Sequence, residues 1–226
     1  MTYELFFGHK SYSSWSLRGW LLLKKFDLPF VEREVELYSG QMAADMAELA
    51  PARLVPTLRT PDGIVVGESL AIAETLAERH PEKTMWPADP AARAAARWLA
   101  AEMHAGFSDL RQDCPMQLLW HYEGFSPSES VLKDLARIEE LWSWARGTVE
   151  TDGPWLFGAY SIADVFYAPV AARIAGFGLP VGAAAQAYVA THLADPAFEE
   201  WRLEGQKDPV EPDPYPFDLP RRPWGL

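Results

Sequence analysis

The chain has 226 residues, enough for one large domain or two smaller ones, each with its own hydrophobic core. Its formal net charge of −12 argues against nucleic acid or an anionic membrane as a partner, because both require clustered Lys and Arg. No apolar run is long enough to span a bilayer, the N-terminus lacks a signal-peptide pattern, and the single cysteine, Cys114, allows neither an internal disulfide nor a thiolate metal site, so we expect a cytoplasmic protein.

The first half of the N-terminal region alternates between strand and helix patterns. Aromatic and aliphatic residues ending at Gly8 predict a strand, and apolar residues at helical spacing, with Ser14 as the expected cap, predict a helix that ends near Pro29. In chain order we expect a strand at 3–7, a helix at about 14–26, a strand at 30–37 and a short helix at 41–49.

The stretch 54–79 predicts a hairpin followed by a helix. Proline cannot donate to a sheet ladder, so Pro56 marks the start of a strand that runs to Leu58. A turn at Asp62-Gly63 leads to a return strand at 64–66, and Ser69 is the expected N-cap of the next helix. The order of elements in residues 1–80 predicts a four-stranded mixed sheet with helices on its faces, the thioredoxin-like layout.

The remaining chain is helical in character. A proline-rich linker, 81–90, precedes an all-α domain at 91–204, and a tail at 205–226 contains many prolines. Within the all-α domain, Ser161 and Asp164 have the spacing of a capping box, which we interpret as a folding element. The expected helices are 91–107, 107–122, 128–150, 161–177 and 183–194.

The Glu68-Ser69 pair is the strongest candidate for a binding site. A helix start presents unpaired N–H groups and the positive end of its dipole, and a serine hydroxyl there adds a donor for a carboxylate. Glu68 has the opposite charge and suits an ammonium group, so the corner fits the zwitterion of an α-amino acid. The alternative is that Ser69 only caps its helix and Glu68 is a solvated acid.

Three motifs occur in order: Val55-Pro56 before a strand, Glu68-Ser69 at the next helix, and the capping box at Ser161. On these motifs, residues 1 to about 204 resemble the soluble glutathione transferase family. The loop at residues 10–18 is similar to the serine-type classes, nearest to the zeta class that includes the maleylacetoacetate isomerases. The resemblance implies a thioredoxin-like domain followed by the all-helical glutathione transferase C-terminal domain, and a homodimer.

The resemblance also implies a cofactor. Glutathione ends in a γ-glutamyl zwitterion, which matches the Glu68-Ser69 corner. In the family the bond before the proline is cis, and the main chain at Val55 pairs with the cysteinyl part of glutathione like an added strand. The implied glutathione-binding residues are Leu54, Val55, Pro56, Glu68 and Ser69.

A serine at the start of the first helix would hold the thiol of glutathione as a thiolate. Pairing with the zeta motif indicates Ser11, and pairing with theta-type sequences indicates Ser13. Ser14 is a third candidate, and Tyr12 is a weaker one because other classes use a tyrosine from an earlier loop position. The three serines remain open as catalytic residues.

The electrophile is expected where the first helix of the all-α domain faces this loop. One helical stripe presents Met103, Phe107, Ser108 and Arg111 as a substrate pocket, although ordinary core packing explains the same pattern. His104 and His121 have no partners at metal-ligand spacing, so no metal is expected.

We therefore predict a glutathione transferase that conjugates the thiolate to a small hydrophobic electrophile or uses glutathione as a cofactor in an isomerisation. The alternative is a non-catalytic glutathione-transferase-like binding or interaction module. The tail matches no element of the family; it either packs over the body through Tyr215, Phe217 and Trp224 or stays loose.

Overall fold

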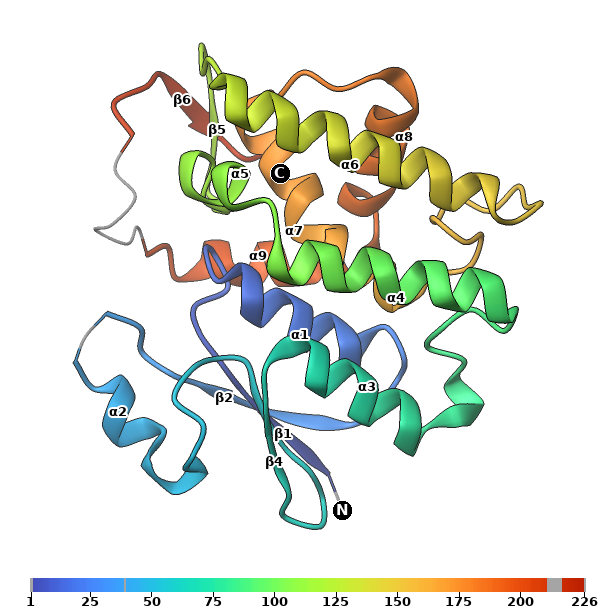
Figure 1. Cartoon of the computed structure of the whole chain (residues 1–226). Coiled ribbons are helices and arrows are strands. Elements are labelled where there is room, and N and C mark those ends of the chain that lie inside the picture. Colours follow the sequence, from blue (N-terminus) through green and yellow to red (C-terminus); the bar gives the residue numbers. More distant parts are fainter. Residues whose placement is uncertain (1, 39, 211–216, 226) are drawn as a thin grey trace.

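The computed structural model describes residues 2–38, 40–210 and 217–225. The N-terminal part forms a four-stranded sheet with helices on both faces (Figure 1). Its elements are β1 (Tyr3–Phe7), α1 (Ser14–Lys24), β2 (Phe30–Glu34), α2 (Met42–Asp45), the 3₁₀ turn η1 (Ala47–Leu49), β3 (Thr57–Arg59), β4 (Val65–Gly67) and α3 (Ser69–Arg79).

The sheet has the order β2-β1-β3-β4 and confirms the predicted thioredoxin-like layout. β1 pairs in parallel with β2 and antiparallel with β3, which pairs antiparallel with β4. Alternate residues of β1 point to opposite faces. Leu5 and Phe7 belong to the large core shared with the helices, whereas Phe6 packs on the other face with Met46 and Leu49 of the α2–η1 region.

Several predicted boundaries in this domain need correction. The second strand ends at Glu34 instead of residue 37, and the helix predicted at 41–49 is split into α2 and η1. The N-cap of α1 is Ser13, not Ser14, and the N-cap of α3 is Glu68, not Ser69. Ser69 is therefore the first residue inside its helix.

The second part of the chain is a bundle around the buried helix α7 (Figure 1). α7 is packed against α1, α4 and α8, so one hydrophobic core runs through both domains. Its elements are η2 (Pro81–Lys83), α4 (Pro90–Ala105), α5 (Ser108–Asp113), β5 (Trp120–Tyr122), α6 (Glu129–Gly147), α7 (Ile162–Phe177), α8 (Ala183–Leu193), α9 (Pro196–Lys207) and β6 (Arg221–Pro223).

The predicted capping box is present at the start of α7. The Asp164 carboxylate accepts hydrogen bonds from the Ser161 N–H at 2.8 Å and from the Tyr188 hydroxyl at 2.7 Å. Burial raises the pKa of this carboxyl, and the bonds to it oppose that rise. The contacts explain Asp164 as a structural residue that ties α7 to α8.

The helix predicted at 107–122 is wrong. Phe107 has φ of 60° and interrupts the helical path between α4 and α5. α5 then ends at Asp113 because Cys114 precedes Pro115, and a residue before proline disfavours the α conformation. The chain continues as an irregular segment into β5.

Residues 217–225 of the tail pack on the body. β6 pairs antiparallel with β5, Phe217 contacts the rings of Tyr122 and Phe177, and Trp224 is buried. Tyr215 lies outside the described residues. α9 extends to Lys207, so the first three residues of the predicted tail, 205–207, are helical. Within the described ranges, no helix has the length and apolar character needed to cross a membrane.

Candidate functional site

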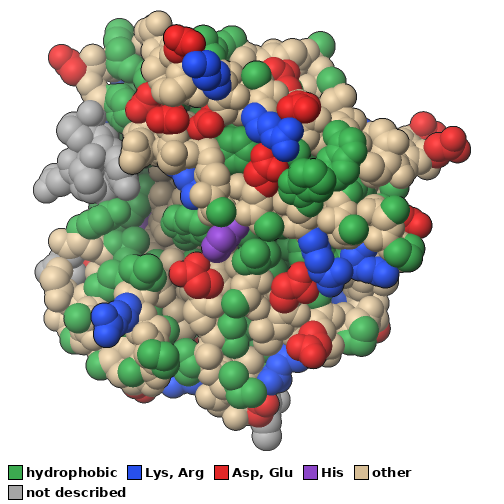
Figure 2. Space-filling view, viewed as in Figure 1, with side chains coloured by type: hydrophobic (Ala, Val, Ile, Leu, Met, Phe, Trp, Pro, Cys, Tyr) green, Lys and Arg blue, Asp and Glu red, His purple; other side chains and the backbone are tan. Residues whose placement is uncertain are grey.

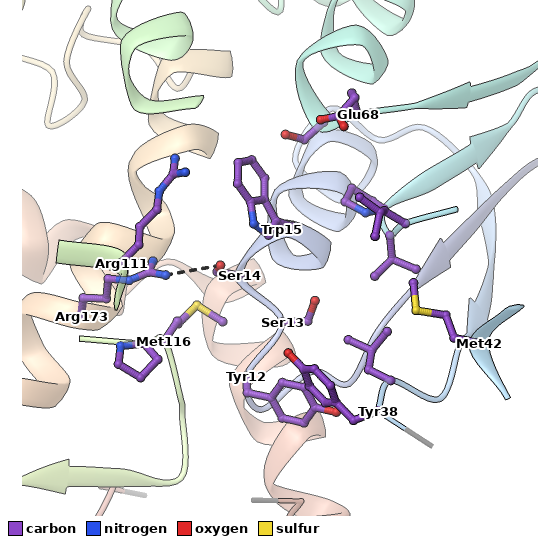
Figure 3. Close-up of a pocket in the computed structure, with 16 residues that line it drawn as sticks. Tyr12, Ser13, Ser14, Trp15, Tyr38, Met42, Glu68, Arg111, Met116 and Arg173 are labelled. Carbon is purple, nitrogen blue, oxygen red and sulfur yellow. Dashed lines mark hydrogen bonds between the residues drawn. The ribbon is translucent and has the colours of Figure 1, made fainter. Parts of the chain in front are cut away.

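A cavity of about 500 Å³ opens at the seam between the two domains. On the face shown in Figure 2, hydrophobic side chains gather along this seam. The cavity is lined from both domains, as the close-up in Figure 3 shows. The lining residues are Tyr12, Ser13, Ser14, Trp15, Leu37, Tyr38, Met42, Leu54, Val55, Pro56, Glu68, Ser69, Arg111, Pro115, Met116 and Arg173. All five residues expected to bind glutathione are among them.

The start of α3 contributes a buried, unused hydroxyl to this cavity. Ser69 is 1% exposed, and its Oγ has no hydrogen-bond partner among the described residues. Glu68, the preceding residue, has φ of 64°, a left-handed conformation that is costly for a residue with a side chain. The strained corner presents the Ser69 hydroxyl and the free N–H groups of the first helical turn to the cavity.

Two further groups border this corner. The Glu68 side chain is 65% exposed, and its carboxylate lies 3.6 Å from Nε2 of His104 on α4. Burial, and secondarily the Arg18 guanidinium, lower the pKa of His104, so its imidazole is neutral at pH 7. A neutral imidazole forms no ion pair with Glu68, so this exposed side chain is available to a cationic ligand group.

The segment before β3 lies beside the corner. The Val55–Pro56 peptide bond is cis, as the family resemblance implied. Leu54 is 66% exposed, and its carbonyl accepts a hydrogen bond of 2.7 Å from the Thr57 hydroxyl. Leu54, Val55 and Pro56 all border the cavity, so the structure brings this segment together with Glu68 and Ser69.

The loop before α1 separates the three candidate serines. Ser11 is fully buried outside the cavity lining, where its hydroxyl donates to the Val210 carbonyl at 3.0 Å and lies 2.8 Å from His9 Nδ1. Ser13 and Ser14 line the cavity. The structure therefore disfavours Ser11 as a group that contacts a ligand there.

Ser13 and Ser14 point to different sides (Figure 3). Ser13 lies toward Met42, and its Oγ is 2.7 Å from Ser16 Oγ, which also accepts a 2.8 Å hydrogen bond from the Gly8 N–H. Ser14 faces the helical domain, where its Oγ accepts a hydrogen bond of 3.4 Å from Arg173. A hydroxyl can rotate its proton, so both serines are able to donate to a ligand.

The opposite wall differs from the predicted stripe. Met103 is fully buried, Phe107 is nearly so, and Ser108 is exposed; only Arg111 of the four lines the cavity. The stripe assumed one continuous helix, but the chain leaves the helical path at residues 106–107. The new direction separates Arg111 from the other three side chains.

Two arginines dominate this wall. Arg111 donates to the carbonyls of Met103 and His104, and its guanidinium lies 4.8 Å from the Trp15 ring centre. Arg173 donates to the carbonyl of Cys114 at 2.9 Å. Burial lowers the pKa of the Arg111 guanidinium, which nevertheless stays protonated at neutral pH because arginine titrates far above it.

Sequence reasoning missed Arg173, Pro115 and Met116 as cavity residues. Arg173 had a signal, because it and Asp164 are the charged residues of an otherwise apolar helix, α7. No sequence pattern marks Pro115 and Met116 as cavity residues, since they lie in an irregular segment. Arg18 is buried outside the lining and stacks on Trp15 at 4.4 Å, in a structural position.

Cys114 is buried, and burial raises the pKa of its thiol to about 12, so it is unreactive at neutral pH. Among the described residues, no three His, Cys, Asp or Glu side chains are grouped in a way that would hold a metal ion.

Known proteins match the chain as follows. Residues 12–79 match the family model "Glutathione S-transferase, N-terminal domain". A probable maleylacetoacetate isomerase of Caenorhabditis elegans is 38% identical over 136 residues, which cover 58% of this chain and 62% of that protein. The maleylacetoacetate isomerase of Rattus norvegicus is 30% identical over 182 residues, covering 74% of this chain and 76% of the relative.

A solved structure agrees with these matches. A glutathione transferase homologue from Burkholderia, crystallised with bound glutathione, has a TM-score of 0.68 and 28% sequence identity. The superposition covers 92% of this chain and all of the other. The match to the nematode relative spans less than two thirds of that protein's length.

Proposed function

The chain belongs to the soluble glutathione transferase family, nearest to the zeta class, and we propose that it binds glutathione at the Glu68-Ser69 corner and activates its thiol with Ser13. One observation carries the proposal: the Ser69 hydroxyl is buried, borders the cavity and has no partner in the described structure. An unsatisfied buried hydroxyl costs about 1–3 kcal/mol, and a ligand carboxylate removes that cost.

The residues present fit an α-amino acid group. Ser69 and the first N–H groups of α3 suit the α-carboxylate, while the exposed Glu68 carboxylate suits the ammonium. The main chain at Val55 lies beside this corner and suits the peptide part of the ligand.

Glutathione supplies the thiol that attacks the second substrate. A free thiol has a pKa of about 8.5, so lowering it by roughly two units requires about 2.7 kcal/mol of preference for the anion. A hydrogen bond to a charged group contributes roughly 1.5–3 kcal/mol. In the structure the Ser13 hydroxyl donates to Ser16 Oγ, which also accepts from the Gly8 N–H. When the Ser13 proton rotates to the thiolate, the Ser16 hydroxyl can donate to Ser13 in turn, and each hydrogen bond then polarises the next.

The second substrate is a small electrophile bound between the loop and the helical wall. Trp15, Pro115 and Met116 offer it apolar contacts, and Arg111 and Arg173 offer two cationic groups. This wall favours an electrophile that has an anionic group, so isomerisation of an unsaturated carboxylic acid is the second candidate beside conjugation.

Calorimetric titration with reduced glutathione tests the proposal. We expect binding by the wild type, and about tenfold or greater weakening in Glu68→Ala and Ser69→Ala, because each variant removes a charged hydrogen bond. Arg53→Ala is a matched control in the same domain, since Arg53 is outside the cavity lining.

Absence of binding at millimolar glutathione would contradict the proposal. If the wild-type protein binds glutathione but converts no electrophile, the result would support the alternative, a non-catalytic binding module.

We also propose a homodimer in the cytoplasm. Family membership supports the dimer, and two aromatic side chains with large exposed areas, Trp98 and Trp144, lie 5.1 Å apart on α4 and α6. The acidic composition and the single buried cysteine fit a reducing compartment. Light scattering of the purified protein, with Trp98→Ser as the variant, tests the dimer.

A further inference from the structure

A series of hydrogen bonds connects α9 and β6 to the loop that contains Ser13. The Ser11 carbonyl accepts a 2.7 Å hydrogen bond from the Leu118 N–H. The Leu118 carbonyl in turn accepts from Nε2 of Gln206 on α9 at 3.1 Å. One residue on, the Leu119 carbonyl accepts a 2.8 Å hydrogen bond from the Trp224 N–H. Gln206 and Trp224 thus bind the Leu118–Leu119 segment, which in turn binds the loop at Ser11.

Trp224 is itself firmly placed. Its ring is 6% exposed and stacks on His121 with the ring centres 4.3 Å apart. Its carbonyl lies 3.5 Å from Gln206 Nε2, and the next carbonyl, of Gly225, accepts a 2.9 Å hydrogen bond from Arg202. The end of β6 is therefore fixed by both α9 and β5.

The segment between α5 and β5 needs this support because it has no regular structure. Residues 114–119 are neither helix nor strand, so their backbone groups need other partners. Gln117 accepts from the Leu119 N–H within the segment, whereas Cys114, Leu118 and the Leu119 carbonyl have partners from other parts of the chain. Pro115 and Met116 of the same segment line the cavity. A displacement of the segment moves the cavity wall and the Ser11 hydrogen bond together.

α9 also touches the loop directly. A Cβ on Gly205 would lie 2.7 Å from the Ser11 nitrogen, too close for any other residue without a shift of the loop. The Ser11 hydroxyl, meanwhile, donates to the Val210 carbonyl beyond α9. Ser11 thus has a partner in the C-terminal part for its side chain and, through Leu118, for its carbonyl.

We propose that Gln206 and Trp224 are positioning residues of the thiol site: through Leu118 and Leu119 they fix the loop in which Ser13 lies. The proposal rests on the proposed function, in that the loop is taken to activate the thiol. Neither residue lines the cavity, so neither contacts a ligand there. A misplacement of about 1 Å at a reacting group can cost up to 10²-fold in rate.

Gln206→Ala is the first test, with Lys207→Ala as the control on the same helix because Lys207 is exposed. The variant loses the hydrogen bond to the Leu118 carbonyl, worth roughly a two- to tenfold change, together with the longer contacts to the Trp224 carbonyl and from Arg202. We expect kcat/KM to fall by that factor. The pH midpoint of the bound thiol, measured by thiolate absorbance, should rise. The Kd of glutathione should change by less than about twofold.

Trp224→Ala is the stronger test, with Phe217→Ala as the matched control. Trp224→Ala keeps the main-chain N–H that bonds the Leu119 carbonyl but removes the ring whose stacking on His121 holds that N–H in place. Phe217→Ala also removes a tail aromatic, but the Phe217 ring contacts Tyr122, Phe125 and Phe177 instead. We expect kcat/KM to fall about tenfold or more in Trp224→Ala and to recover in Trp224→Phe. Phe217→Ala should lower Tm by a similar amount to Trp224→Ala but cause a smaller loss of kcat/KM.

Hydrogen exchange measured by mass spectrometry provides a readout that needs no glutathione. We expect the amides of residues 9–14 to exchange roughly two- to tenfold faster in Gln206→Ala than in Lys207→Ala. Unchanged exchange and an unchanged pH midpoint in Gln206→Ala would overturn the proposal, whether or not Trp224→Ala folds. Parallel losses of kcat/KM and glutathione affinity would also overturn it. Lack of glutathione binding by the wild type refutes the proposed function alone, because the exchange experiment still measures the coupling.

Discussion

The two walls of the cavity are built in different ways. On the N-terminal side, the part of the wall proposed to hold glutathione comes from one stretch, residues 54–69, which contains a cis peptide bond, a left-handed Glu68 and the first turn of α3. The loop before α1 and the region around Tyr38 and Met42 complete this wall. The wall from the helical domain collects Arg111, Pro115, Met116 and Arg173 from α5, an irregular segment and α7.

This difference suits the two walls to different ligands: the first to glutathione, which is constant, and the second to the electrophile, which varies. Backbone groups and short side chains, as at Ser69, leave little freedom, so the first wall suits one ligand. Long side chains such as Arg173 and Met116 change their reach with each substitution, so the second wall sets which electrophile is accepted.

The largest expected effect on activity is that of Ser13→Ala, in the loop between the two walls. Loss of a hydrogen bond to the thiolate predicts roughly a 10- to 100-fold fall in kcat/KM, and the pH midpoint of the bound thiol should rise toward about 8.5. Stopped-flow absorbance across pH measures both. Ser14→Ala is the control; if it shifts the midpoint instead, the helical-domain side of the loop activates the thiol.

Arg173→Met tests the second wall. Removing this cation predicts about a tenfold rise in KM for a carboxylate-bearing electrophile and less than a twofold change for a neutral one of similar size. Arg173→Lys keeps the charge and should recover part of the difference. Equal losses with both electrophiles would mean that Arg173 only supports the Cys114 carbonyl.

Glu68→Gly tests the strain in the first wall. Both Glu68→Gly and Glu68→Ala remove the carboxylate and should weaken glutathione binding, but glycine tolerates φ of 64°. We therefore expect the glycine variant to be more stable than the alanine variant by about 1 kcal/mol, a difference of roughly 2–4 °C in Tm. Thermal unfolding of the two purified variants decides the point, and equal Tm values would show that the corner is unstrained.

The smallest expected effect comes from His104, which joins the walls through its contact with Glu68. Burial lowers the pKa of His104, so protonation begins only below the usual 6.5. As the pH falls through that lowered pKa, the imidazolium competes with a ligand ammonium for Glu68. Because a lowered thiol pKa by itself makes glutathione bind more tightly as pH rises, the effect of His104 is measured as the ratio of the Kd of the wild type to the Kd of His104→Phe. This ratio should stay flat from pH 8 to 6.5 and rise by about twofold below it.

Sequence reasoning succeeded where the chain acts locally. The helix start next to Glu68-Ser69, the strand entrance at Pro56 and the capping box at Asp164 each depend on residues within a few positions of one another. Even there the N-cap is Glu68 and not Ser69, and the binding role of this corner stays a prediction. The sheet order followed from the order of elements.

It failed where distant segments meet. Ser11, Ser13 and Ser14 were equivalent in sequence, and only the packing of α9 and the tail shows that Ser11 faces Val210. The predicted pocket stripe through Met103 was wrong because Phe107 has a positive φ and changes the direction of the chain. Nothing in the sequence indicates this conformation, which is rare for an aromatic residue.

The hydroxyl of Ser11 and the carbonyl of Val210 are 199 positions apart, which has a consequence for biosynthesis. At about 5–20 residues per second, the ribosome releases these two partners roughly 10 to 40 s apart. The sheet and the Glu68-Ser69 corner lie within the first 80 residues and are made early, but they share one core with α4 and α7, which are made later. The loop before α1 obtains its partners from α9 and β6 last of all, so the site is completed only when the C-terminal part of the chain has been made.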